Sequence, residues 1–500
     1  MTTREHTAEQ LSKTGFLSRT QRGNFINGRE IMPASGRFLP VVDPATELVV
    51  AQAPDSDATD VDSAIAAARR AFEDSEWSRL RPADREHLLF KLSVLIEANA
   101  DELSALETLQ NGKLRGIARM VDVGAGAEFV RYMAGWATKI EGQTLQPSIG
   151  FPPGAQYHTS TRREPVGVVA AIVPWNFPLA IALWKVAPAL TTGCTVVLKP
   201  SPETPLTALR LAELVIEAGF PPGVLNVVCG GAEAGSSLVS HPGINKISFT
   251  GSTATGQAIG RAAADHFTRT TLELGGKSPL IVLEDADIEQ AAMGAAMGIF
   301  FNQGQVCTAG SRVYVHHRIF DQVVERLAKA AESMKIGSGF DPGTQLGPVA
   351  SRRHFERVMG YLDMARAEGA TALTGGTRSG DSGFFVKPTV LVNAHAGMRV
   401  VREEVFGPVV VAMPFRDLDD AVQQANDSPY GLAASIWSNN LSQVQRLIPR
   451  LKAGTVWVNC HNILDNNLPL GGYKRSGIGK DLGRAAVESY TELKSVCMAF

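Results

Sequence analysis

The stretch VGVVAAIVPWNFP, residues 166–178, is an apolar run followed by a Pro-Trp-Asn-Phe-Pro turn. Three more apolar runs occupy residues 195–198, 224–228 and 244–249, and a segment with helical spacing follows each run. Strands that alternate with crossover helices form a parallel, doubly wound sheet. The sequence therefore predicts an α/β fold built on a Rossmann-like parallel sheet.

The segments around this sheet extend the same plan. Residues 24–54 predict short antiparallel strands, residues 57–134 several helices, and the Gly- and Pro-containing residues 141–162 an extended excursion. The helix after the second strand should begin with Thr204 as N-cap and Pro205 at its first position, and stop at Gly219. After residue 276 a second α/β region begins, with strands at 280–283 and 313–315 and helices at 291–301, 320–335 and 350–368.

Composition narrows the class of protein. A chain of 500 residues is long enough for two or more domains, and a net charge of -2 gives no basic surface for nucleic acid. The five cysteines are scattered without a C-x-x-C pair, which argues against a disulfide framework or a zinc site and favours a reducing compartment, the cytoplasm. Residues 1–22 lack the continuous apolar run of a signal peptide, and no uncharged apolar segment is long enough for a membrane span.

Cys307 is the candidate nucleophile, because it lies in a polar turn after an Ala-, Met- and Phe-rich helical run. Such a thiol can also be an inert small apolar residue. Asn176 and Glu273 both occur in apolar surroundings, where an unpaired polar group is costly. They could cap a turn and pair with a lysine, or serve as an oxyanion donor and a base beside the thiol.

A strand, a glycine turn and a helix start also occur in order at residues 247–256, an arrangement whose free backbone N–H groups can receive a phosphate. The same pattern is found in ordinary turns. Lys199, at the end of the second strand, could meet a ribose or phosphate, or could be a solvated surface lysine.

Seven motifs together carry a family resemblance: PWNFP, LKPS, FTGST, LELGGKSP, FNQGQVCTAGSR, EEVFGPV and LPLGGYKRSG. In this order they resemble the signatures of the aldehyde dehydrogenase superfamily over residues 24–498. The resemblance implies oxidation of an aldehyde to a carboxylic acid with a nicotinamide cofactor. Cys307 would form a thiohemiacetal and then a thioester, Asn176 would hold the oxyanion, and Glu273 would activate the hydrolytic water.

Two other functions stay open beside this one. A non-catalytic, NAD-binding relative would not need Cys307, Glu273 and Asn176 together. An acylating dehydrogenase passes the thioester to coenzyme A and generally lacks a base at the position of Glu273.

The resemblance also implies a cofactor site and a substrate pocket. NAD is expected, with NADP possible, because Pro202 replaces the carboxylate that many NAD-preferring relatives have three residues after the lysine, and Glu203 follows one step later. The expected cofactor residues are Trp175, Lys199, Gly251, Ser252, Gly256, Glu404 and Phe406. The expected pocket residues are Phe177, Ala180, Ile181, Trp184, Phe301, Val306, Thr308, Leu464 and Leu470. Almost all of them are apolar, which favours an apolar or aromatic aldehyde. Phenylacetaldehyde is the best candidate, and an aliphatic or amino aldehyde is the alternative. No metal is expected.

The domain organisation that the resemblance implies has three parts. Residues 1–140 and 163–274 would form the NAD(P)-binding domain, residues 275–477 the catalytic domain, and residues 141–162 and 478–500 a small β oligomerisation arm. The expected partners are a small-molecule aldehyde and further copies of the chain in a dimer or tetramer, with no nucleic acid and no membrane. The last four residues also fit a prenylation box, although a hydrophobic terminal strand explains them without lipidation.

Overall fold

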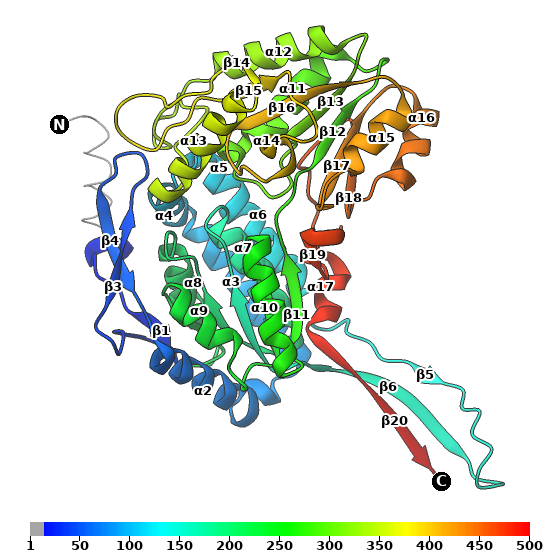
Figure 1. Ribbon diagram of the computed structural model, residues 1–500. Helices are drawn as coiled ribbons and strands as arrows, with labels where there is room; N and C mark the ends of the chain where they lie inside the picture. The colour runs from blue at the N-terminus through cyan, green and yellow to red at the C-terminus, as the bar shows by residue number, and fades with distance from the viewer. Residues whose placement is uncertain (1–14) are drawn as a thin grey trace.

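The computed structural model describes residues 15–500, so the first 14 residues of the segment considered for a signal peptide lie outside it. Two large sheets, each with helices packed on it, form the body, and a narrow arm of strands projects from it (Figure 1). The predicted α/β class, with a parallel cofactor-type sheet and a second α/β region, is confirmed.

The first sheet contains the four runs predicted from the sequence. Its strand order is β19-β11-β10-β7-β8-β9-β1-β2, and the strands from β11 to β9 are parallel. Apart from the start of β11, these strands are almost fully buried, as expected for a parallel sheet covered on both faces. Its strands are β7 (Val168–Ile172), β8 (Thr195–Lys199), β9 (Leu225–Val227), β10 (Lys246–Thr250), β11 (Arg269–Glu273), β1 (Asn24–Ile26), β2 (Arg29–Ile31) and β19 (Gly477–Ile478).

The predicted N-terminal strands and helices are present. β1 and β2 pair antiparallel at the edge of the first sheet, while β3 (Phe38–Val42) and β4 (Val49–Pro54) form a separate hairpin. The helices associated with this sheet are α2 (Ala58–Asp74), α3 (Pro82–Ala98), α4 (Ala100–Asn111), α5 (Arg115–Ile117), α6 (Ala125–Ala134), α7 (Pro178–Thr192), α8 (Leu206–Glu217), α9 (Ala232–Val239), α10 (Thr253–Asp265) and α17 (Gly483–Ser489). A π-helical segment, η3 (Ala118–Gly124), precedes α6.

The start of α8 differs from the prediction. Pro205, not Thr204, is the N-cap residue, and the buried Thr204 Oγ1 has no hydrogen-bond partner among the described residues. The N–H of Leu206, the first helical residue, instead bonds to the side chain of Gln110 on α4 at 2.8 Å. A distant amide therefore replaces the local cap. The predicted stop is confirmed, because Gly219 follows the helix with a left-handed φ of 96°.

The second sheet has the order β14-β15-β16-β13-β12-β17-β18 and is parallel except for β14. The predicted strands near 280 and 313 and the three predicted helices are confirmed. The elements are β12 (Pro279–Val282), α11 (Ile288–Phe300), β13 (Arg312–His316), α12 (Phe320–Ser333), α13 (Arg352–Ala367), β14 (Thr371–Thr374), β15 (Thr389–Val392), α14 (Arg399–Arg402), β16 (Val409–Phe415), α15 (Leu418–Asn426), β17 (Ala433–Trp437), α16 (Leu441–Leu447) and β18 (Thr455–Val458).

The arm is a three-stranded sheet of β5 (Thr144–Leu145), β6 (Tyr157–Pro165) and the C-terminal β20 (Thr491–Ala499) (Figure 1). The predicted excursion at residues 141–162 is therefore confirmed as an extended segment. Cys497 lies within β20 and faces Thr159 of β6 in the register, so the end of the chain is a strand, as the simpler interpretation expected.

The chain passes between the two large sheets at two connections, which lie side by side at the end of β11, next to Glu273. After β11 the chain passes through Leu274 and Gly275 into the second sheet, and it returns through Ser476 to β19, which pairs with β11. The Leu274 N–H donates to the Ser476 carbonyl at 2.9 Å, and the Ser476 hydroxyl donates to the Gly275 carbonyl at 2.8 Å. The division into three domains by residue range stays a prediction.

Candidate active site

Two amide side chains join the turn after β7 to the turn before Cys307. The Asn176 Nδ2 donates to the Gln305 carbonyl at 2.9 Å, and the Asn302 Nδ2 donates to the Asn176 carbonyl at 3.0 Å. Asn302 and Gln303 both have left-handed φ values, 48° and 59°. Two consecutive non-glycine residues in this region mark a turn that its surroundings hold in place. Asn176 retains a second amide hydrogen that this bond does not use.

Cys307 follows that turn and is partly exposed. Burial, together with the carboxylates of Glu404 and Glu273, raises the pKa of the Cys307 thiol to about 12. The backbone N–H groups of Cys307 and Thr308 act in the opposite direction. Without cofactor or substrate, the sulfur is therefore a neutral thiol at neutral pH.

Glu273 is the last residue of β11 and is buried. Its Oε1 has no hydrogen-bond partner among residues 15–500. Burial raises the pKa of this carboxyl well above its usual value, and the nearby Asp481 adds to the rise. Gly471 makes room for it, because a Cβ there would lie 2.5 Å from Oε1. A buried carboxyl with a free oxygen and a raised pKa has the properties of a general base.

A buried ion pair beside Glu273 was not predicted. Lys185 of α7 contacts Asp481 with 3.0 Å between Nζ and Oδ2, and both side chains are almost fully buried. Asp481 raises the pKa of Glu273, whereas Lys185 and Lys480 lower it. The sequence offered one signal for this pair, which was a lysine inside the otherwise apolar segment 178–190.

An aromatic cluster connects the turn that contains Asn176 to the segment that follows Glu404. The Trp175 ring lies 5.3 Å from that of Phe406 and 4.8 Å from that of His354. His354, which sequence reasoning missed, bonds through Nε2 to the Phe406 carbonyl at 2.7 Å, and burial lowers its pKa to about 4. Phe406 has a left-handed φ of 65°, so this bond holds an unusual backbone conformation.

Glu404 points back toward the crossing between the sheets. Its Oε1 accepts from the Gly276 N–H at 2.9 Å, and a Cβ at Gly275 would collide with its Oε2. Burial raises the pKa of Glu404 to about 7, against the opposing effects of the Gly276 N–H, Arg357 and Lys277.

Lys199 and the start of α10 lie on the first sheet. Lys199 is buried rather than solvated, its Nζ donates to the Pro200 carbonyl at 3.3 Å, and burial lowers its pKa. Ser252 is the N-cap of α10 and accepts from the Thr255 N–H at 3.2 Å. Gly256 lets α10 pack closely on the strand end, because a Cβ there would collide with Leu274.

Most of the predicted pocket residues belong to one apolar cluster, whereas Thr308 and Leu464 do not. Phe177 and Phe301 stack with ring centroids 6.1 Å apart, and Thr308 is bonded to Asn462, two residues before Leu464. Leu464 is 45% exposed and lies outside the apolar cluster that holds the other apolar residues of the set. That cluster includes Phe177, Ala180, Ile181, Val306 and Leu470, with Trp184 and Phe301 packed against it.

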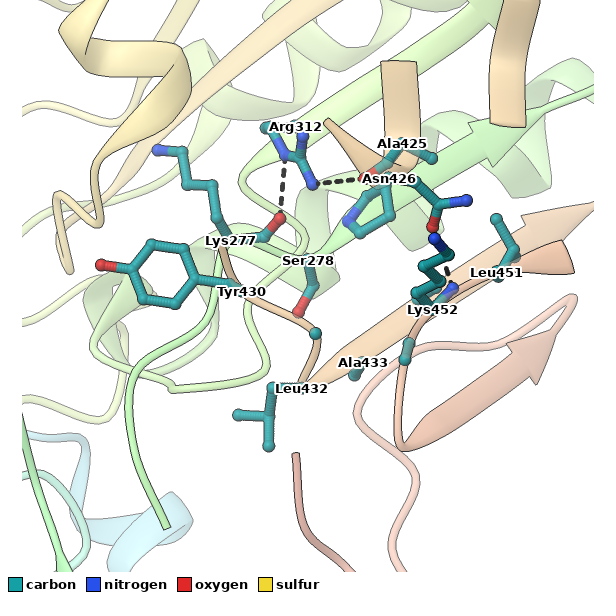
Figure 2. Close-up of a pocket in the computed structure, with 14 residues that line it drawn as sticks. Lys277, Ser278, Arg312, Ala425, Asn426, Tyr430, Leu432, Ala433, Leu451 and Lys452 are labelled. Carbon is teal, nitrogen blue, oxygen red and sulfur yellow. Dashed lines mark hydrogen bonds between the residues drawn. The ribbon is translucent and has the colours of Figure 1, made fainter. Parts of the chain in front are cut away.

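A narrow pocket follows the crossing between the sheets (Figure 2). Arg312 closes one side by donating to the carbonyls of Lys277 and Ala425, both at less than 3 Å. The Lys277 Nζ and Ser278 Oγ are buried without hydrogen-bond partners in the described part of the chain, and burial lowers the pKa of Lys277 to about 7. Arg312 thus fixes the segment that leads from Glu273 into the second sheet.

Residues 15–500 contain no group of three or more His, Cys, Asp and Glu side chains arranged to hold a metal ion. In the same residues no helix is long and apolar enough to cross a membrane.

The two large sheets are mainly parallel, and a hydrogen bond connects the turn before Cys307 to the turn at the carboxyl end of β7. These features define the protein as an α/β enzyme with a cysteine as candidate nucleophile. Residues 31–496 match the aldehyde dehydrogenase family, and the chain belongs to that family.

Individual relatives agree with this assignment. The chain is 51% identical to the phenylacetaldehyde dehydrogenase of Pseudomonas fluorescens, with 95% of each chain covered. It is 47% identical to a putative aldehyde dehydrogenase of Bacillus subtilis, with 96% of each covered. Among solved structures, the NAD+ complex of an aldehyde dehydrogenase from Bacillus cereus has a TM-score of 0.94 at 46% identity and covers 100% of this chain and 99% of its own.

Proposed function

We propose that the protein oxidises an apolar or aromatic aldehyde, best phenylacetaldehyde, to the carboxylic acid with NAD+ as oxidant. The main support for this proposal is the pair of hydrogen bonds between Asn176 and the turn that precedes Cys307. These bonds connect an amide donor with the turn that leads to the thiol, although the two segments are far apart in the sequence. The unpaired carboxyl of Glu273 supplies the third group.

Cys307 is the nucleophile in this scheme. An aldehyde has no leaving group, so the sulfur first adds to the carbonyl carbon and forms a thiohemiacetal. Because the thiol has a high pKa, its proton passes to a base as the C–S bond forms, and the unpaired Glu273 carboxylate would accept it and release it to solvent before the water is activated. The nicotinamide, when bound, supplies a hydride acceptor, and the carbon is left as a thioester of Cys307.

Asn176 holds the oxyanion of the adduct. One hydrogen of its Nδ2 is bonded to the Gln305 carbonyl, which fixes the plane of the amide, and the other is free for the substrate oxygen. The Cys307 backbone N–H is the second donor. Loss of one such donor costs about 3–4 kcal/mol of transition-state stabilisation in comparable enzymes.

Glu273 activates the water that cleaves the thioester. Its free Oε1 accepts a proton from that water, and its raised pKa makes it a stronger base than an exposed glutamate. The presence of this base favours hydrolysis to the acid over transfer of the acyl group to coenzyme A.

The cofactor residues fit a dinucleotide. Lys199 is a buried cation at the carboxyl end of β8 with a backbone carbonyl as its hydrogen-bond partner, and the α10 N-terminus beside Ser252 offers backbone N–H groups to a phosphate. Gly251 and Gly256 keep this turn close to the strand. Glu404 would hold a ribose hydroxyl, with Phe406 and Trp175 as apolar neighbours.

NAD+ is favoured over NADP+ by the residues near Lys199. Pro202 offers no carboxylate, but Glu203 is close enough to Lys199 to act on its pKa. That charge would repel a 2′-phosphate. The NAD+ complex of the Bacillus cereus aldehyde dehydrogenase supports the same choice.

The aldehyde is assigned from the pocket walls and from one relative. Phe177 and Phe301 form a stacked pair, and apolar Ile181, Trp184 and Val306 accompany them. These walls suit an aromatic side chain. The Pseudomonas fluorescens relative, named a phenylacetaldehyde dehydrogenase, supports that substrate.

The assembly is proposed to be a dimer or tetramer. The arm carries exposed apolar side chains, among them Phe151 and Phe500, each 80% exposed, and Leu493 at 59%. Exposed apolar groups on a projecting sheet favour burial against another copy. Light scattering that gave the monomer mass would contradict this assembly. The unpaired cysteines support a reducing compartment, for which we propose the cytoplasm.

A panel of aldehydes with both cofactors tests the function. We expect the highest kcat/KM for phenylacetaldehyde with NAD+, lower values for short aliphatic and amino aldehydes, and stoichiometric formation of phenylacetic acid and NADH. Phe301→Ala should lower kcat/KM more for phenylacetaldehyde than for acetaldehyde. A higher kcat/KM for an amino aldehyde would refute the substrate assignment, and phenylacetyl-coenzyme A as the product would refute hydrolysis.

A further inference from the structure

Thr308, the residue after Cys307, is held at its carbonyl and at its hydroxyl by one distant loop. The Thr308 carbonyl lies 2.9 Å from His461 Nε2, and the Thr308 hydroxyl donates to Asn462 Oδ1 at 2.7 Å. His461 and Asn462 follow β18 of the second sheet. Two adjacent residues thus clamp the residue next to the nucleophile.

The direction of the His461 bond follows from its partners. A carbonyl oxygen can only accept, so Nε2 carries the hydrogen and donates to Thr308. Burial lowers the pKa of His461 to about 4, so the ring is neutral at neutral pH and Nδ1 has no hydrogen. Nδ1 lies 3.0 Å from the buried hydroxyl of Ser435 in β17, which therefore donates to it.

Packing leaves the His461 ring little freedom. An ideal Cβ at Gly298 would lie 3.1 Å from the ring, and one at Gly310 would lie 3.4 Å from it. The Trp457 ring lies 4.9 Å away on β18. Asn462 has a left-handed φ of 58°, which asparagine tolerates better than most residues. The clamp is therefore a rigid feature built from several elements.

We propose that His461 and Asn462 are positioning residues that hold Thr308 so that its backbone N–H faces the Cys307 sulfur and favours the thiolate. This inference rests on the proposed role of Cys307 as nucleophile. The Thr308 N–H is one of two backbone donors that lower the pKa of Cys307.

The clamp matters because the other surroundings of the sulfur oppose ionisation. Burial, Glu404 and Glu273 all raise the pKa of Cys307. No cationic side chain appears among the principal groups that act on this thiol in the described residues. A backbone N–H that is aimed at the sulfur is then a main source of thiolate stabilisation.

Alkylation of Cys307 measures the thiolate without needing aldehyde or cofactor. The rate constant with iodoacetamide is measured from pH 7 to pH 10, and peptide mass spectrometry separates Cys307 from the exposed Cys497, which serves as an internal reference. His461→Phe keeps an aromatic ring without the donor, whereas His461→Gln retains an N–H. His395→Phe, an exposed position outside the site, is the matched control.

We expect His461→Phe to slow alkylation of Cys307 about tenfold at a given pH, equivalent to about one pKa unit, and to move its pH profile upward. kcat should fall by a similar factor with KM little changed. His461→Gln should recover most of the rate, and His395→Phe and the Cys497 rate should match the wild type. Equal alkylation rates in wild type and His461→Phe would overturn the clamp.

Equal losses in the Phe and Gln variants would also overturn the clamp, because packing alone would then explain the effect. If His461→Phe does not fold, Asn462→Gly removes the acceptor for the Thr308 hydroxyl, together with the longer 3.4 Å bond from Asn462 Nδ2 to the Gly298 carbonyl, and suits the left-handed φ. It should slow alkylation about threefold, within the range of one hydrogen bond, and no change would count against the proposal. The proposed function fails separately if wild type fully alkylated at Cys307 still oxidises aldehyde.

Discussion

Replacement of Lys113 by Met tests how the first turn of α7 is held. Lys113 Nζ lies 2.8 Å from Asp122 Oδ2, and neither side chain has any exposed surface. Asp122 belongs to the π-helical segment η3, and Glu107, also buried, accepts from the Leu179 N–H at 3.0 Å. Lys113 also lies 4.3 Å from the Phe177 ring centroid. This cluster supports the start of the helix that follows Asn176.

Lys113→Met keeps the side-chain volume but removes the cation. Removing one partner of a buried ion pair costs about 3–5 kcal/mol, because the other charge is left uncompensated. Asp122 Oδ1 and Glu107 Oε2 already lack hydrogen-bond partners in the described chain, so neither carboxyl has a ready replacement. We therefore expect a clear fall in the thermal midpoint, and a lower kcat because Asn176 and Phe177 lose support.

The loss should depend on pH. Burial raises the pKa of Asp122, and Lys113 opposes this rise, so the variant should have a still higher pKa at Asp122. A carboxyl whose pKa is higher in the folded than in the unfolded chain loses stability as pH rises between the two values. The deficit of the variant should therefore be larger at about pH 8 than at about pH 5.

Differential scanning fluorimetry at the two pH values measures this deficit. The double variant Lys113→Met with Asp122→Asn is the matched control, because it removes the uncompensated charge and keeps an acceptor for the helix. It should recover most of the lost midpoint at pH 8. A single variant as stable as the wild type, or a deficit independent of pH, would refute the reasoning.

Two further predictions concern the reaction. Glu273→Gln should give a burst of NADH followed by steady-state turnover reduced about 10²–10⁴-fold, because the water loses its base. In the wild type, the steady-state rate should rise with pH through the raised pKa of Glu273, because only the carboxylate form can accept the proton. Stopped-flow absorbance measures both, and an unchanged steady state would exclude Glu273 as the base. Glu203→Gln should raise kcat/KM for NADP+ relative to NAD+ about tenfold by removing a like charge, and an unchanged ratio would show that Glu203 does not set cofactor choice.

The sequence predicted those parts of the fold that depend on local patterns. Apolar runs such as residues 166–173 predicted buried parallel strands, because strands covered on both faces need continuous apolar sequence. The predicted N-cap of α8 was wrong. The first N–H of this helix bonds to Gln110, which is almost 100 residues away and leaves no local signal in the sequence.

The candidate site shows the same division. Motif order identified Cys307, Glu273 and Asn176 as candidates, but periodicity and spacing could not show that Asn302 bonds to Asn176 or that His461 bonds to Thr308. These bonds join segments more than 100 residues apart, so tertiary packing alone creates them. The burial of Lys199 was likewise not decided by the sequence, which allowed a solvated surface lysine, whereas the side chain is buried.

In the proposed reaction Cys307 carries the acyl group, and trapping that group on the enzyme tests this role. Glu273→Gln is mixed with phenylacetaldehyde and NAD+, quenched in acid during the burst, digested, and analysed by peptide mass spectrometry. We expect a phenylacetyl group on the peptide that contains Cys307, in an amount that matches the NADH of the burst, and none when Cys307→Ala is added. NADH formation with no acyl group on Cys307, or with undiminished turnover in Cys307→Ala, would contradict it.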